Sequence, residues 1–260
     1  ESSAASDVYK RQDMSNLIKN GYDILKLENL IPDFKCRELQ EYYKESFKIK
    51  ESNNLELVLN GTYTSETKEE IERLYSELTE EGTDIKISDS GQEVDGYFLN
   101  ILSPNKDFDL HQKIYNEIPH KYQTQIWYQN RIEEGVSYNI FKMLIHKITL
   151  DNYDFKNLDI VIQSIRETYY DMNCHITPHE DGVDENRLFV ILLYLSNNYK
   201  SGDGGEFNIL DENNLIKETI TPEFGNVVVL DFTETNVKHF VNRVLKNYGR
   251  NALISFVYKK

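Results

Sequence analysis

The sequence predicts an α+β fold with a mainly β core, in which N-terminal helices buttress a β-sandwich or jelly roll. Residues 160–260 contain short β-branched and aromatic runs separated by Gly, Asn and Asp, a pattern typical of strands. The residues before them carry several helix signals. No linker rich in Pro, Gly or Ser divides the 260 residues, a length that suffices for one large domain with its own core.

The first residues are expected to lie outside this domain. Residues 1–13 are small and polar without periodicity, and Met14 resembles a natural start. We therefore expect residues 1–13 to be a non-native or disordered extension and residues 14–260 to form a single domain. Within it, residues 14–160 are expected to give helical support and residues from about 160 to 260 the jelly-roll core.

The expected elements follow in chain order. Residues 22–31 (YDILKLENLI) predict a strand of mixed pattern, and residues 32–47 predict a helix that opens with Pro32. Further helices are expected at residues 65–82, which begin with a capping box and end at a glycine, and around residues 110–118 and 137–148. Strands are expected at residues 159–172, 187–196, 205–210, 226–232 and 251–259.

Composition excludes some roles and compartments. The formal net charge of −15 repels phosphate backbones, so we expect no nucleic acid partner. Two cysteines in 260 residues form no disulfide framework. We find neither an apolar run of about 18 residues nor a basic-plus-apolar leader, and we therefore expect a cytoplasmic protein without a membrane partner.

Residues 174–181 hold the densest ligand chemistry in the chain. His175 and His179 are four residues apart, as in a helical zinc site, but Pro178 between them would cost a helix about 3 kcal/mol. In an extended chain, alternate side chains share a face, so His179 and Asp181 point the same way. One imidazole and one carboxylate are two of the three ligands of the facial triad that binds non-haem Fe(II).

Two downstream residues extend this prediction. His239 is the only histidine after His179, and it follows a buried strand and a polar loop, so the next strand can bring it back to the same end of the sandwich. Arg250 begins an otherwise apolar strand, and a cation entering a core needs a partner. That partner is either an acidic side chain of the protein or the carboxylate of a bound cosubstrate.

The C-terminal third resembles the prolyl 4-hydroxylase-like branch of the Fe(II)/2-oxoglutarate-dependent dioxygenases. The ordered motifs that carry the resemblance are PHED, RLFVILLYLS, SGDGGEFNI, PEFGNVVVLDF and HFVNRVLKNYGRNALISFVY. LENLIPDFKCRELQEYY is similar to the strand and helix that open many members, whereas residues 45–160 show no family motif. Serine follows Tyr-Leu where the family usually has Asn, and arginine stands where the collagen-type enzymes have lysine.

The resemblance implies a double-stranded β-helix, the jelly roll of this family, and roles for six residues. Iron would be held by His179, Asp181 and His239, which makes these the catalytic residues. The cosubstrate 2-oxoglutarate would be bound by Arg250, Tyr194 and Tyr170, with Tyr169 as the competing choice for the last. Dioxygen would be the second cosubstrate, and ascorbate would support turnover.

The reaction implied is oxidative decarboxylation of 2-oxoglutarate to succinate and CO₂, coupled to hydroxylation of an unactivated C–H bond. Asp181 favours hydroxylation, because halogenating relatives replace this carboxylate with a small residue. The substrate is expected to be an amino acid, a peptide or a small molecule, with Arg187 and Trp127 as candidate substrate contacts. Alternatives are desaturation or cyclisation of a small metabolite, zinc-dependent chemistry, and a non-catalytic cupin-like metal-binding module.

Overall fold

The computed structural model describes only part of the chain. The described residues are 21–44, 56–61, 69, 73, 84–89, 97–102, 123–151, 157–181, 186–233 and 237–260. The predicted extension 1–13 and the helix predicted around residues 110–118 lie outside them, as does the helix predicted at 65–82 apart from Glu69 and Arg73.

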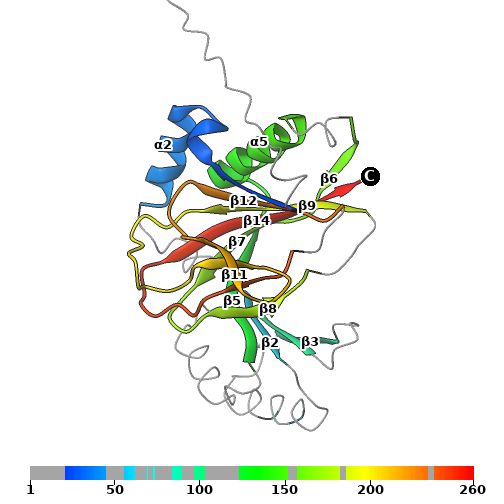
Figure 1. Cartoon of the computed structure of the whole chain (residues 1–260), viewed down its shortest axis with the longest axis vertical. Coiled ribbons are helices and arrows are strands. Elements are labelled where there is room, and N and C mark those ends of the chain that lie inside the picture. Colours follow the sequence, from blue (N-terminus) through cyan, green and yellow to red (C-terminus); the bar gives the residue numbers. More distant parts are fainter. Residues whose placement is uncertain are drawn as a thin grey trace, which may run out of the picture.

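Two antiparallel four-stranded layers form the core (Figure 1). One layer consists, in spatial order, of β12 (Asn226–Asp231), β9 (Arg187–Tyr194), β14 (Arg250–Lys259) and β7 (Ile165–Tyr170). The other consists of β8 (His175–His179), β13 (His239–Val241), β10 (Phe207–Leu210) and β11 (Ile216–Ile220). From β7 to β14 the chain passes back and forth between the layers, which is the connectivity of a double-stranded β-helix and confirms the predicted fold class.

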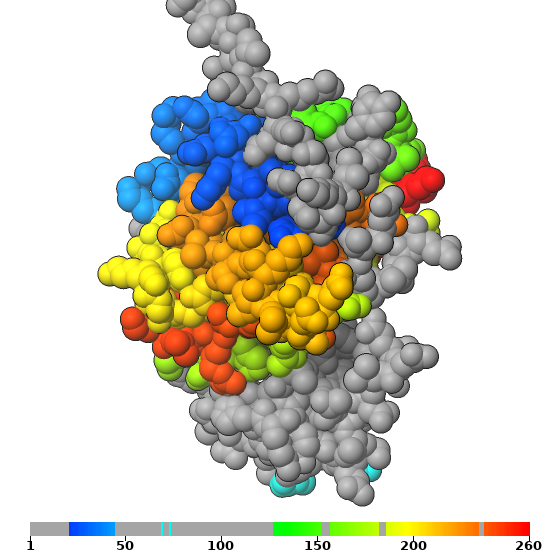
Figure 2. All heavy atoms as spheres, in the orientation of Figure 1, coloured from blue at the N-terminus to red at the C-terminus, as the bar shows by residue number. Residues whose placement is uncertain are grey.

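The remaining strands extend or join these layers. β5 (Gln123–Ile132) pairs with both β7 and β8 and so links the two layers along one side. β1 (Tyr22–Lys26) pairs with β12. Figure 2 shows the surface of β11 beside β1, where Lys217 lies over the Tyr22 ring. The others are β2 (Glu56–Gly61), β3 (Asp84–Asp89), β4 (Tyr97–Leu102) and β6 (Ile160–Ile162).

Side-chain alternation divides the apolar residues of the first layer into two cores. On β9, Val190 and Tyr194 point between the layers, whereas Phe189, Ile191 and Leu193 point outward beneath the helices. Both faces of β9 are therefore buried, which explains why its sequence is apolar throughout rather than alternating. The inner core surrounds the candidate site, and the outer core anchors the helices.

Helices α2 (Asp33–Tyr42) and α5 (Gly135–Asp151) cover the outer face of this layer (Figure 1). α5 contributes an apolar stripe that includes Phe141, Leu144 and Ile148, at the spacing of an amphipathic helix. Among the described residues, none of the helices has the length and apolar character needed to cross a bilayer. The support predicted for the core is therefore present on one face.

Several elements differ from the sequence-based expectation. The segment expected as one strand over residues 22–31 ends at Lys26 and continues as a 3-10 helix, η1 (Leu27–Asn29). Residues 14–160, expected to be helical, also contain β2, β3, β4 and β5. β11 was not expected either, because four of its five residues are exposed and offer no apolar alternation.

A buried hydrogen-bond network joins the helices to the core. Tyr43, at the end of α2, donates a hydrogen bond to the Glu167 carboxylate on β7, and its oxygen lies 2.9 Å from Ser137 Oγ on α5. Burial raises the pKa of Glu167, although hydrogen bonds from Tyr43 and Asn130 oppose this effect. The folded protein therefore holds the Glu167 proton more tightly than the unfolded chain does.

This raised pKa gives a testable pH dependence. Stability from Glu167 is fully present below its unfolded pKa and is lost as the pH rises through the higher folded pKa. We expect Glu167→Gln, which stays neutral and keeps an acceptor for Tyr43, to raise Tm at pH 7 and above and to flatten its pH dependence. Thermal unfolding from pH 4 to pH 8 checks this, and an unchanged slope would contradict it.

Candidate active site

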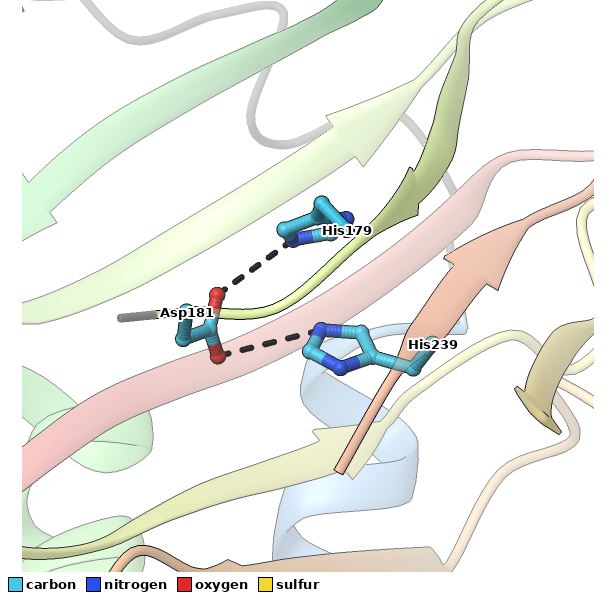
Figure 3. A group of neighbouring side chains, drawn as sticks. All are labelled: His179, Asp181 and His239. Carbon is cyan, nitrogen blue, oxygen red and sulfur yellow. Dashed lines mark ion pairs between the residues drawn. The ribbon is translucent and has the colours of Figure 1, made fainter. Parts of the chain in front are cut away.

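Three side chains converge at one end of the space between the layers (Figure 3). His179 ends β8, Asp181 follows it by two residues, and His239 begins β13. The β8–β13 pairing places His239 directly opposite His179. One ligand atom from each residue lies within 4.8 Å of the others, so the structure brings together the three residues expected to bind iron.

Each imidazole is oriented by a backbone carbonyl. The Nδ1 atoms lie 2.9 Å from the Thr177 oxygen for His179 and 2.8 Å from the Val237 oxygen for His239. A carbonyl only accepts hydrogen bonds, so Nδ1 of each ring carries a proton. In the neutral ring Nε2 then keeps its lone pair, and it donates to Asp181 only when the ring is protonated. This arrangement fixes the tautomer that a metal requires.

Both Nε2 atoms face the Asp181 carboxylate, at 3.3 Å for His179 and 3.7 Å for His239. Burial acts to raise the pKa of Asp181, but the hydrogen bond with His179 and the charges of His239 and Arg187 lower it below its usual range. Burial lowers the pKa of His239, whereas Asp181 raises that of His179 against burial. Two imidazole nitrogens and an ionised carboxylate are a donor set that fits Fe(II).

The triad lies in the wall of a cavity of about 320 Å³. The cavity walls come from β5, β7, β9, β12 and β14 on one side and from β8, β10 and β13 on the other. Apolar side chains such as Leu192, Ile254 and Phe256 form most of its surface. A concave, mainly apolar cavity with a few convergent polar groups is the usual form of a small-molecule site.

Arg250 lies in the wall of the same cavity and is only 1% exposed. Its Nε donates a hydrogen bond of 2.6 Å to the Gly205 carbonyl, and its guanidinium lies 4.0 Å from the Tyr170 ring centroid. None of the described residues forms an ion pair with it within 4 Å. The acidic side-chain partner considered from the sequence is thus not within ion-pair distance among the described residues, although the charge of Arg250 contributes to lowering the pKa of Glu206. Its pairing with a cosubstrate carboxylate stays a prediction.

The two expected tyrosines flank Arg250. The Tyr194 ring lies 5.3 Å from the guanidinium, and its hydroxyl is buried without a hydrogen-bond partner among the described residues. Burial raises the pKa of Tyr194 to about 12, although the charge of Arg250 acts in the opposite direction, so the hydroxyl remains a donor at neutral pH. Tyr170 lines the cavity, whereas its competitor Tyr169 donates to Asn247 instead.

A Gly-Gly turn holds Arg250 in place. The carbonyls of Gly204 and Gly205 accept hydrogen bonds from Tyr248 Oη and Arg250 Nε, at 2.8 and 2.6 Å. Both glycines have positive φ, of 78° and 83°. A Cβ on Gly205 would lie 2.6 Å from Tyr248 Oη and 2.7 Å from Arg250 Cδ, so only glycine leaves the guanidinium where it is.

We expect Gly205→Ala to weaken 2-oxoglutarate binding by about 10- to 100-fold, because the new methyl group must displace Arg250. Gly202→Ala is the matched control, since Gly202 has a φ of 90° but a Cβ there meets nothing within 4 Å. Both variants carry the backbone cost of about 1–2 kcal/mol in stability. The KM for 2-oxoglutarate is measured for each, and equal values for the two variants would contradict this role.

The two candidate substrate contacts lie in different surroundings. Trp127 lines the cavity, as expected. Arg187 instead donates a hydrogen bond of 2.7 Å to the Asp181 carbonyl, and its guanidinium lies 4.8 Å from the Phe256 ring centroid. Arg187 therefore positions the backbone of a triad residue.

Sequence reasoning did not identify several polar residues of the cavity wall. Arg166 and Thr168 precede Tyr170 at two-residue spacing on β7, and Gln129 lies opposite Thr168 on β5. The alternation of Arg166, Thr168 and Tyr170 is visible in the sequence and could have assigned all three to one face. Which face that is depends on the pairing of β7 with β5 and β14.

Comparison with known proteins gives a family match over the C-terminal part of the chain. Residues 165–257 match the family model described as the 2OG-Fe(II) oxygenase superfamily. The matched segment contains the triad, Tyr170, Tyr194 and Arg250. The match agrees with the superfamily and enzyme class predicted from the sequence, a 2-oxoglutarate- and Fe(II)-dependent oxygenase. In that family Fe(II) is the metal cofactor, and 2-oxoglutarate and dioxygen are the cosubstrates. None of the curated proteins matches the chain.

Solved structures show distant likenesses. A prolyl-4-hydroxylase from Pseudomonas putida is 15% identical, with a TM-score of 0.48, and the match covers 95% of this chain and 96% of that one. IDO from Bacillus thuringiensis has the same identity and TM-score, over 95% and 97%. A prolyl hydroxylase from Trichoplax adhaerens, in complex with a peptide fragment of the hypoxia inducible factor oxygen degradation domain, has 15% identity and a TM-score of 0.44, over 88% and 94%.

Proposed function

From the match of residues 165–257 to the 2OG-Fe(II) oxygenase superfamily, we propose that this protein is a hydroxylase of the prolyl 4-hydroxylase-like branch. Its substrate is a peptidyl or free amino acid. The observation that carries the proposal is one cavity that contains both a His-Asp-His triad and a buried arginine with no acidic partner within ion-pair distance among the described residues. A binding module has no need for both.

The triad side chains would hold the iron. Nε2 of His179 and His239 and a carboxylate oxygen of Asp181 are the donor atoms, and the carbonyls of Thr177 and Val237 keep the two rings in the required tautomer. Iron held there would supply the redox chemistry that couples decarboxylation of 2-oxoglutarate to oxidation of a C–H bond by dioxygen. In the metal-free protein, Asp181 interacts with His179, so metal binding replaces this contact.

The cosubstrate would be fixed by Arg250, Tyr194 and Tyr170. The guanidinium of Arg250 is buried and planar, which suits bidentate recognition of the far carboxylate of 2-oxoglutarate. The Tyr194 hydroxyl, which has no partner among the described residues, would donate to that carboxylate. The apolar walls exclude water from the reacting centre, so the C–H bond of the substrate is the group presented for oxidation.

The reaction products distinguish hydroxylation from the alternative functions. Desaturation or cyclisation of a small metabolite consumes 2-oxoglutarate equally but adds no oxygen to the product. A non-catalytic cupin-like module or a zinc enzyme makes no succinate. We propose hydroxylation rather than these alternatives, because the triad contains the Asp181 carboxylate and not a small residue in its place.

The first test is succinate formation by the purified protein with Fe(II), ascorbate and 2-oxoglutarate. It is run without substrate and then with free amino acids and Pro-containing peptides. We expect one class to stimulate succinate release and to gain one oxygen atom by mass spectrometry. Absence of succinate under all conditions, with Fe(II) bound, would refute the proposal. Loss of stimulation when ascorbate is omitted would support its auxiliary role.

A further inference from the structure

The cavity contains a second arginine that the proposed chemistry does not use. Arg166 lines it from β7, at the far end of the β7–β14 wall from Arg250. Arg250 pairs with Tyr170, and Ile254 pairs with Arg166, four residues further along β14. Four residues of a strand span about 13 Å, so the two guanidinium groups mark opposite ends of this wall.

A third arginine lies next to Arg166. Arg131 on β5 is directly opposite Arg166 in the β5–β7 pair, and directly paired residues project on the same face. That face is the cavity face, because the neighbouring pair Gln129 and Thr168 lines the cavity. Arg131 is exposed and Arg166 is half-buried, so the pair runs from the rim into the cavity.

Arg166 also donates a hydrogen bond of 3.2 Å from Nε to Ser164 Oγ. Two arginines side by side at this end of the cavity attract an anion from solution.

We infer that Arg166 binds the carboxylate of a free amino acid, which is the substrate of the proposed hydroxylase. The guanidinium fork suits a carboxylate, and Arg131 at the rim adds attraction for it. The same cavity is lined by Ile254, Phe256 and Trp127, which offer apolar contacts to an aliphatic side chain. This inference rests on the proposed function, because it takes the iron end of the cavity as the site of oxidation.

The size of the cavity favours a free amino acid over a peptide. The cavity of about 320 Å³ is at the small end of ligand sites and must also hold the cosubstrate, so little room remains for a chain that continues on both sides.

The test uses equilibrium binding beside turnover. The twenty free amino acids are titrated calorimetrically into the anaerobic full-length protein loaded with Fe(II) and 2-oxoglutarate. The best binder is then compared with its carboxamide. We expect the carboxamide to bind about 10- to 100-fold more weakly, and Arg166→Gln to weaken binding of the free acid by a similar factor. The KM for 2-oxoglutarate should stay unchanged in this variant.

Arg37→Gln on α2 is the matched control, because it removes the same charge from an exposed helix on the outer face of the core. Equal binding of acid and carboxamide, unaltered binding in Arg166→Gln, or a preference for an internal peptide residue would each overturn the inference. Arg166-dependent binding without succinate release would support the amino acid site and refute the proposed reaction. The two failures are therefore distinguishable.

Discussion

Asp181→Ala is expected to abolish substrate-stimulated succinate formation. Asp181 is the only carboxylate in the His179–Asp181–His239 group, and both Nε2 atoms face it within 3.7 Å. Loss of a partner outside the coordination shell of a metal already costs about 10- to 100-fold in affinity or activity, so loss of a ligand should exceed that range. Activity should fall by more than 100-fold, together with iron content after gel filtration.

A control variant distinguishes the loss of a metal ligand in Asp181→Ala from damage to the fold. Asp159→Ala removes an equal charge from a side chain that is 78% exposed near the end of β14 and should leave activity unchanged. Circular dichroism and Tm of Asp181→Ala should remain close to those of the unaltered protein, because the Asp181 carboxylate contacts imidazoles rather than the apolar core. Retained iron and activity in Asp181→Ala would refute the proposed triad.

The ligand triad could be predicted from the sequence because its geometry is mostly local. His179 and Asp181 are two residues apart, so an extended chain alone puts them on one face. His239 is different, since its partner lies 60 residues away. It could be selected only because no other histidine follows. Its position opposite His179 arises from the β8–β13 pairing, which no local pattern specifies.

Two of the missed strands, β5 and β11, escape detection for physical reasons. β5 places Gln129 and Trp127 in the cavity wall and Arg131 at its rim, so its sequence lacks the apolar alternation of a core strand. β11 is an exposed edge strand with only Ile220 buried. Strand prediction from periodicity detects alternating burial of apolar side chains, whereas β11 buries little apolar surface and β5 presents polar side chains to the cavity.

Arg166 shows the same limit at the level of a single residue. Its spacing from Tyr170 is visible in the sequence, but its role depends on β5, which brings Arg131 opposite it, and on β14, which sets its distance from Arg250. Arg187 illustrates the reverse case. The sequence offered it as a substrate contact, whereas its guanidinium holds the Asp181 carbonyl and lies over aromatic rings.

Arg250→Gln is expected to raise the KM for 2-oxoglutarate by about 100-fold or more while kcat changes less. Charge-assisted hydrogen bonds contribute about 1.5–3 kcal/mol each, and a bidentate pair makes two of them. Arg250→Lys should raise the KM for 2-oxoglutarate by about tenfold, less than Arg250→Gln does. The ammonium keeps the positive charge but loses the bidentate geometry of the guanidinium and the hydrogen bond from Nε to the Gly205 carbonyl. Steady-state kinetics and anaerobic calorimetry with 2-oxoglutarate measure both variants.

Comparison of Arg250→Gln with Arg250→Lys distinguishes a role in cosubstrate binding from a purely structural role. If Arg250 only stabilised the fold through Gly205 and the rings of Tyr170 and Tyr194, both variants would lower Tm and leave the affinity for 2-oxoglutarate intact. Tyr194→Phe sharpens the comparison, because it removes only a buried hydroxyl without a partner among the described residues. It should cost about tenfold in 2-oxoglutarate affinity and nothing in Tm, since without bound cosubstrate that hydroxyl is a desolvated donor with no compensating bond. A loss of Tm in Tyr194→Phe with unaltered affinity would assign this end of the cavity to folding alone.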